Sequence, residues 1–328
     1  VRLVDEAWHV LDFAAPEVWP AWRTYRGEVY FAAIPKVQDI LINPPTDPGT
    51  AYVRLQQTVQ DRPVYLRDPS PIERVWGGAY RFQLGGRRIE AVQFYAPSRE
   101  HVERWIKDAE RRFSPNPLPP SAPRILSSLE YLIGTIIHEA FHRYQESAVE
   151  RMKMVNKKHP SPFDGTEMQA ALSRLEGQIL SRAVSVTERD QLVELSRQFL
   201  AVRWERRRQL TSEDIAWEKR NEFVEGTAMY TETRVLQVLA ERGYRPKVLG
   251  SAEPNFHGFA IASDMVKLNI QWISQSALIR GEEGALTRHY YAGMAQGMML
   301  DRLVGPEWKN NILGPEVYFE NLLEKASA

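Results

Sequence analysis

The sequence predicts an α+β fold, with a small β-rich N-terminal region over residues 1–115 and a mainly helical region over residues 116–328. Residues 1–97 carry short, aromatic-rich segments separated by Pro and Gly, a pattern typical of strands and turns. From Ser98 onward, apolar residues recur at helical spacing. A chain of 328 residues, 43% of them hydrophobic, can bury a sizeable core in one large domain or two smaller ones.

The clearest strand pair is a hairpin formed by Ala79–Leu84 and Arg87–Tyr95. Gly85 and Gly86 stand between the two segments and supply the positive φ angles that a two-residue turn needs. We therefore expect two antiparallel strands here, which belong either to the core of a sheet or to its edge.

The helical region is expected to begin with a helix over Ser98–Phe113, followed by a Pro-rich linker over Ser114–Pro123. The almost wholly apolar run Leu129–Ile137 predicts a helix that is buried on most of its faces. Thr166 and Gln169 have the spacing of a capping box, which predicts the start of a further helix.

Two more helix starts follow. Thr187 and Asp190 give a similar capping signal before a helix over Leu192–Leu210. Ser212 is expected to be the N-cap of the next helix, which carries acidic residues in its first turn.

Two imidazoles and a carboxylate directly follow the apolar run, in the segment His138-Glu139-Ala140-Phe141-His142. Residues four apart lie above one another on a helix, so the two histidines can bind one metal ion from the same face. The carboxylate of Glu139 lies one position round, within reach of a water on that metal. This is the His-Glu-x-x-His arrangement in which the carboxylate acts as a general base.

The simpler interpretation is a pair of surface histidines on an amphipathic helix. The apolar run argues against it, because a buried helix must satisfy its polar groups. Each unpaired buried polar group costs about 1–3 kcal/mol. One metal ion would satisfy both histidines and the carboxylate together.

Zinc is the metal that this pattern predicts. A catalytic zinc keeps three protein ligands and leaves its fourth position to water, whereas a structural zinc is closed by four protein ligands. The chain has no cysteine, which removes most structural zinc patterns and any thiolate nucleophile. The metzincin extension is excluded, because Gln145 and Ala148 stand where Gly and His are required. Glu146 lies one turn beyond His142, but a straight helix carries it past the metal.

A better third ligand lies in the expected helix Trp217–Tyr230, where Glu225 precedes Gly226. A glycine inside a strong helical pattern costs about 1 kcal/mol relative to alanine, so it calls for an explanation. Small residues at 226 and 228 suit a close approach to another helix or to a metal centre. Glu222, one turn earlier, is the alternative ligand or a partner that supports a ligating histidine. A packing glycine beside an exposed glutamate is the simpler interpretation.

Together the two motifs resemble those of the gluzincin zinc metallopeptidases, in the branch of that family that contains aminopeptidases. In that branch the Glu of an Asn-Glu-Gly-x-Ala motif is the third zinc ligand, which the resemblance places at Glu225. This chain has Val224 in place of the Asn. The Glu-x-x-x-Asp motif of the thermolysin branch is absent, since Met229 stands where the Asp would be.

A third segment, Tyr290–Gly305, strengthens the resemblance. Members of the branch carry a Tyr-x-Lys-Gly motif before an apolar helix, and its Tyr donates a hydrogen bond to the oxyanion of the tetrahedral intermediate. Alignment on the glycine gives that role to Tyr290, with Ala292 in place of the Lys. One such donor is typically worth about 3–4 kcal/mol. His289 and Tyr291 are the alternative donors, and an aromatic pair that packs a helix start is the simpler interpretation.

The resemblance implies a zinc peptidase that hydrolyses peptide bonds with a metal-activated water, with Glu139 as general base. It also implies that an edge of the N-terminal sheet pairs with an extended peptide or protein substrate. Two alternatives stay open: a zinc hydrolase of a non-peptide amide, and a catalytically inactive binding protein with the gluzincin fold. The Gly-x-Met-Glu-Asn motif that holds a free substrate amine is absent, so exopeptidase activity does not carry over.

Composition narrows the partners and the location. Lys plus Arg and Asp plus Glu number 42 each, so no net charge recruits nucleic acid or anionic lipid. No stretch approaches the roughly 20 apolar residues that span a bilayer, so we expect no membrane span. The chain begins at Val1 instead of Met, which is compatible with a removed signal peptide and favours a secreted protein over a cytoplasmic one.

Overall fold

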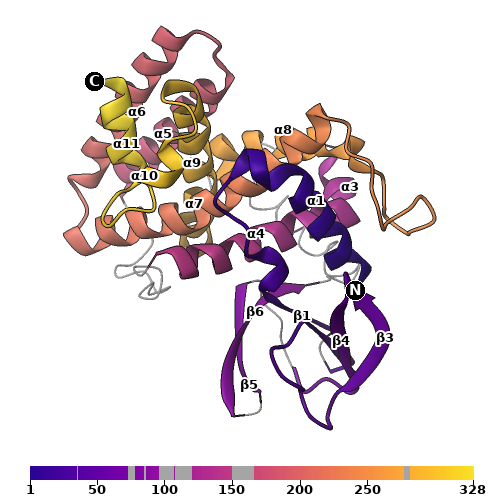
Figure 1. Cartoon of the computed structure of the whole chain (residues 1–328). Helices are drawn as coiled ribbons and strands as arrows, with labels where there is room; N and C mark the ends of the chain where they lie inside the picture. Colours follow the sequence, from indigo (N-terminus) through magenta and orange to yellow (C-terminus); the bar gives the residue numbers. More distant parts are fainter. Residues whose placement is uncertain are drawn as a thin grey trace. The chain divides into compact units, whose positions relative to one another are not determined.

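The computed structural model describes residues 1–34, 36–72, 78–84, 86–95, 107, 120–149, 166–276 and 281–328. It confirms the α+β class, because a mixed sheet in the N-terminal part is followed by a mainly helical part (Figure 1). The expected helix Ser98–Phe113, apart from Lys107, and the expected boundary at residue 115 lie outside the described residues, as do residues 114–119 of the Pro-rich linker. The linker was predicted to extend to Pro123, but helix α3 already begins at Ala122, because proline is tolerated in the first turn of a helix.

The sheet has six strands in the order β3-β4-β2-β1-β6-β5. Strands β1 and β6 run parallel, and every other neighbouring pair runs antiparallel. The strands are β1 (Val29–Ile34), β2 (Gln38–Ile42), β3 (Val53–Val59), β4 (Arg62–Arg67), β5 (Gly78–Leu84) and β6 (Arg87–Tyr95).

The predicted hairpin is confirmed as strands β5 and β6, whose register runs from Gly78 opposite Gln93 to Leu84 opposite Arg87. Gly86 adopts a φ of +76°, the positive angle that the turn requires. Strand β5 is the edge of the sheet on this side. One face of the sheet carries an apolar cluster formed by Val29, Phe31, Ala33, Leu41, Leu84, Ile89 and Ala91.

Helix α1 (Arg2–Val18) was not expected in a region whose composition suggested strands. Its apolar residues nevertheless recur every three or four positions and are buried, among them Val4, Trp8 and Leu11. Glu6 is also fully buried, because its carboxylate accepts hydrogen bonds from the hydroxyl of Tyr244 and from the backbone amides of residues 247–249. A chain segment distant in sequence therefore satisfies this charge.

The remaining described helices follow the sheet in the sequence (Figure 1). They are α3 (Ala122–Leu126), α4 (Leu129–Ala148), α5 (Glu167–Ser185), α6 (Arg189–Arg207), α7 (Ser212–Glu241), α8 (Ala262–Gln275), α9 (Gly281–Leu303), α10 (Trp308–Asn311) and α11 (Phe319–Ser327). Helix α4 carries the apolar run that was predicted to be buried, and Ile133, Ile136 and Ile137 have no exposed surface.

The helix starts test the capping predictions. At α5 the capping box between Thr166 and Gln169 is present in both directions. At α6 the prediction was wrong, because the N-cap is Glu188 and it makes no capping hydrogen bond through its side chain. At α7 the cap lies one residue earlier than predicted: Thr211 Oγ1 accepts from the amide of Asp214 at 3.1 Å, and the carboxylate of Asp214 accepts from the amide of Thr211 at 3.2 Å.

Contacts between Cα atoms divide the chain into two compact units. The first comprises Val1–Lys107, Pro120–Tyr144 and Arg234–Met265, and contains α1, the sheet and most of α4. The described residues of the second lie within Gln145–Thr233 and Val266–Ala328, and in it α5, α6, α9 and α11 pack together. None of the described helices is long and apolar enough to cross a membrane, as expected.

Candidate metal centre

His138, Glu139 and His142 all lie on α4, as predicted. Their neighbours Ala140 and Phe141 have no exposed surface and anchor the helix in the core. The two imidazole rings are neighbours on one face: their centroids are 4.8 Å apart and the ring planes are inclined by 83°. His138 is 5% exposed, whereas Glu139 and His142 are half-buried. The alternative of two surface histidines does not describe this helix.

Glu225 lies on α7, and it completes a group of three potential metal ligands. His138, His142 and Glu225 each offer one ligand atom, and these atoms all lie within 4.8 Å of one another. Among the described residues this is the one group of three or more His, Cys, Asp or Glu side chains that fits such a limit.

The donor set suits zinc. Two imidazole nitrogens and one carboxylate oxygen are ordinary zinc ligands, and tetrahedral ligands about 2.0–2.2 Å from the ion are about 3.3–3.6 Å apart. The ligand atoms of this group lie within 4.8 Å of one another. Three protein ligands leave a coordination position open, which is the arrangement of catalytic zinc rather than structural zinc.

Glu222, the alternative ligand, is held by an arginine. Its two carboxylate oxygens accept hydrogen bonds from Arg203 at 2.6 and 2.8 Å, and both side chains are 4% exposed. A carboxylate held by both oxygens in this way is engaged in a charge-assisted pair. Glu225 is therefore the carboxylate of α7 that is placed for a metal ion.

Arg203 belongs to a larger buried ionic cluster between α5, α6, α7, α9 and α11. Its members are Glu176, Arg203, Arg206, Arg207, Glu218, Glu222, Arg288 and Glu320. Burial alone raises the pKa of Glu218, but the attraction of Arg206, Arg207 and Arg288 outweighs it and brings that pKa well below the usual range. Glu218 is therefore kept ionised by the arginines around it.

Helices α7 and α9 cross at two glycines. A Cβ atom added to Gly226 would lie 2.5 Å from the Cα atom of Gly293, and the reverse distance is the same. No side chain fits at either position, because the obstacle is backbone. The close approach predicted from Gly226 is confirmed, and it places the residue after Glu225 in contact with the helix that carries Tyr290.

The candidate hydrogen-bond donors on α9 occupy different surroundings. His289 is 2% exposed and packs edge-on against Trp217, with ring centroids 5.4 Å apart. Burial, and then the nearby charge of Arg288, lower the pKa of His289 well below its usual value, so the ring is neutral. Tyr291 stacks on Trp272 with an inclination of 12°. Tyr290 is half-buried and lies three residues before Gly293; its role stays a prediction.

Two polar residues of α4 were not assigned a role from the sequence. Arg143 binds Glu90 of β6 at 2.7 Å and Glu28 at 3.4 Å, which ties the helix to the sheet. Gln145 is fully buried and reaches α7. The sequence contained one sign of these contacts: both long polar side chains lie within one turn of His142, next to an apolar stretch of the helix.

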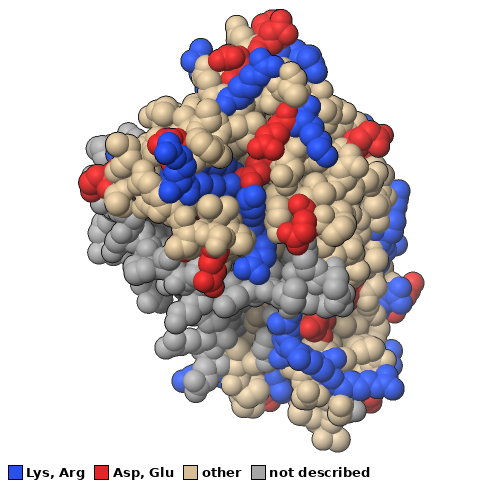
Figure 2. Space-filling view, turned by 90° about the vertical axis from the view of Figure 1, so that its left-hand side faces the viewer, with Lys and Arg blue, Asp and Glu red and all other residues tan. Residues whose placement is uncertain are grey.

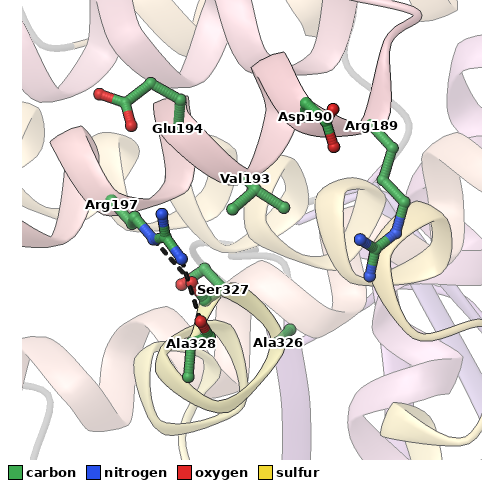
Figure 3. A pocket seen from close by; sticks show the side chains of 8 residues that line it. All are labelled: Arg189, Asp190, Val193, Glu194, Arg197, Ala326, Ser327 and Ala328. Carbon is green, nitrogen blue, oxygen red and sulfur yellow. Dashed lines mark hydrogen bonds between the residues drawn. The ribbon is translucent and has the colours of Figure 1, made fainter.

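A cavity of about 410 Å³ lies apart from these residues, between α6 and the end of α11 (Figure 3). Arg197 projects toward it and donates hydrogen bonds to the backbone oxygens of Ser327 and Ala328 at 2.7 and 3.0 Å. Asp190 and Glu194 balance the charges of Arg189 and Arg197 along its wall. In the upper part of Figure 2, side chains of opposite charge likewise lie next to one another on the surface.

Comparisons of the chain with models of known protein families, with curated proteins and with solved structures found no match. The resemblance to gluzincins therefore depends on the three motifs of this chain. The metal-ligand geometry is an independent observation, because it comes from the fold.

Proposed function

We propose that this protein is a zinc-dependent peptidase. The observation that carries the proposal is the group formed by His138, His142 and Glu225, whose ligand atoms come from two helices and lie within 4.8 Å of one another. The donor types, the open coordination position and a carboxylate next to the first histidine together favour a catalytic zinc over a structural one.

Each residue of the group has a defined task. His138 and His142 offer ring nitrogens, and Glu225 supplies the one negative charge among the ligands. A zinc ion held by these three side chains would supply Lewis-acid chemistry and would lower the pKa of a bound water toward about 7. Glu139 accepts a proton from the attacking water and passes it to the leaving nitrogen, and Tyr290 donates a hydrogen bond to the oxyanion.

The sheet offers a place for an extended substrate. Among the described strands, β5 has a neighbour on one side, β6, and an edge strand of this kind offers backbone amides and carbonyls. An extended peptide that adds to such an edge gains main-chain hydrogen bonds without a requirement for particular side chains. Peptides and unfolded proteins are therefore the substrates that we propose.

Zinc analysis combined with a peptide-cleavage assay tests the proposal. Purified protein should retain about one zinc ion per chain, should cleave a mixed peptide library, and should lose activity on chelation and regain it with zinc. Glu139→Gln should bind zinc as the wild type does, while its turnover falls by about 100-fold to 10,000-fold through loss of the general base.

Glu146→Gln is the matched control, because it makes the same change one turn beyond His142 on the same helix. It should keep both zinc and activity. If Glu139→Gln retained its turnover, the assignment of Glu139 as the general base would be wrong. A zinc-loaded protein that cleaves non-peptide amides but no peptide would show that the substrate class is wrong.

A further inference from the structure

Gln145 is an unusual residue at its position on α4. It lies three residues after His142, one turn further along the same helix face. Its side chain has no exposed surface, although glutamine is mostly found at protein surfaces. A buried amide must be hydrogen-bonded, because an unsatisfied one costs about 1–3 kcal/mol.

The amide nitrogen of Gln145 donates two hydrogen bonds to α7. Its Nε2 atom donates to the backbone oxygen of Val224 at 3.0 Å and to Oγ1 of Thr227. Thr227 is 1% exposed, and its hydroxyl in turn donates to the backbone oxygen of Phe223 at 2.7 Å. A single side chain of α4 therefore holds a backbone atom and a side-chain atom of α7.

These two contacts flank the candidate ligand Glu225, since one partner precedes it and the other follows it by two residues. Sliding a helix by one residue moves every side chain by about 1.5 Å along the axis and turns it by about 100°. Apolar packing between two helices tolerates small shifts, whereas a directional hydrogen bond to a particular carbonyl does not. The two hydrogen bonds of Gln145 thus favour one register of α7 at Val224 and Thr227.

We propose that Gln145 is a positioning residue of the metal centre, which sets the register between α4 and α7 so that Glu225 meets His138 and His142. This inference rests on the metal site of the proposed function and does not require that the protein cleave peptides. It applies to the binding of the metal itself, so zinc affinity is the direct readout.

Gln145→Met is the informative variant, because methionine keeps the length of the side chain and removes the donor. Gln296→Met is its matched control. Gln296 is also fully buried, but its Nε2 donates to the backbone oxygen of Ala292, within its own helix. Both variants lose one buried amide, and the first alone loses a bond between α4 and α7.

The experiment measures the dissociation constant for zinc on the full chain, by competition with a colorimetric chelator at a temperature where every variant is folded. The melting temperature of each metal-free protein is recorded beside it. We expect Gln145→Met to weaken zinc binding by about 10-fold to 100-fold, the range found for residues that support metal ligands. Gln296→Met should leave zinc binding near that of the wild type.

Thr227 provides a second, milder test. Thr227→Val removes the hydroxyl that Gln145 contacts and should weaken zinc binding. Thr227→Ser keeps a hydroxyl at this position and should bind zinc with the affinity of the wild type. The double variant Gln145→Met/Thr227→Val should lose less affinity than the two single losses combined, because both act on one interaction.

Equal zinc affinities for Gln145→Met and Gln296→Met would overturn the inference and leave the peptidase proposal intact. Weakened zinc binding in Gln145→Met together with an absence of peptide cleavage in the wild type would support the inference and overturn the peptidase. A wild-type chain that binds no zinc would overturn both.

Discussion

At the scale of single residues, the two glutamates of α7 show how one helix separates a structural carboxylate from a candidate metal ligand. Glu222 and Glu225 are three residues apart, and both were considered as ligands. Arg203 holds both oxygens of the first, while the second joins His138 and His142 in the metal group. The two glutamates therefore differ in their neighbours: Glu222 faces an arginine, and Glu225 faces two histidines.

This separation predicts opposite effects of two alanine substitutions. Glu225→Ala should weaken zinc binding strongly and lower the stability of the metal-free protein less. Glu222→Ala should leave Arg203 with fewer partners in the protein interior and lower the free energy of unfolding by about 3–5 kcal/mol. Chelator competition and urea unfolding of the metal-free proteins measure the two quantities. If Glu222→Ala weakened zinc binding more than Glu225→Ala does, Glu222 would be the third ligand instead of Glu225.

The sequence predicted the histidines of α4 well, because residues four apart share a helix face in any protein. The glycine beside Glu225 and the family resemblance led to the prediction that Glu225 joins these histidines, and its carboxylate lies close to them, while its role as a ligand stays a prediction. The sequence left Glu222 open, because the deciding contact is with Arg203 of α6, and no local rule reports which side chain faces another across two helices. The contacts of Gln145 with Val224 and Thr227 were not predicted for the same reason.

At the scale of elements, the crossing of α7 and α9 has no room for a side chain. Gly226→Ala should therefore be destabilising by about 1–3 kcal/mol, because the added methyl group meets the backbone of Gly293 and the helices must separate. The better helix propensity of alanine, about 1 kcal/mol, offsets part of this loss. Urea unfolding measures the net effect.

Gly250→Ala is the control for this variant, because nothing lies within 4 Å of a Cβ atom added there. It should leave the free energy of unfolding within about 0.5 kcal/mol of the wild type. A Gly226→Ala protein as stable as the wild type would show that the two helices can move apart without cost.

Prediction of the elements succeeded where a local signal was strong. The Gly-Gly hairpin and the capping box at Thr166 depend on neighbouring residues and were found as expected. Helix α1 was not predicted, because the aromatic-rich segments and the Pro and Gly residues of positions 1–97 suggested strands, although the apolar residues of α1 recur at helical spacing. The cap of α7 was placed one residue late, since Thr211 and Ser212 both favour that position.

At the scale of the whole molecule, acid should destabilise the fold through His289. Its pKa is lowered in the folded state, so between that pKa and the unfolded value of about 6.5 the unfolded chain binds more protons. This contribution is complete above about pH 6.5 and is lost as the pH falls toward the folded-state pKa. One such group gives a slope of up to about 1.4 kcal/mol per pH unit.

Urea unfolding of the metal-free protein between about pH 5 and 7 measures this slope. His289→Leu should flatten it, because the ring that takes up the proton on unfolding is absent. His257→Leu is the control, since the side chain of His257 is exposed, and it should retain the wild-type slope. Identical slopes for His289→Leu and the wild type would show that other groups account for the acid sensitivity.

The buried ionic cluster has a consequence for how the protein responds to heat. The hydration free energy of ionised groups becomes less favourable as temperature rises, so the desolvation penalty for burying them becomes smaller. The apolar contacts that surround the cluster do not strengthen in the same way. As the temperature rises, the arginine–glutamate pairs therefore contribute a larger share of the stability of the helical part of the chain, and the apolar contacts contribute a smaller share.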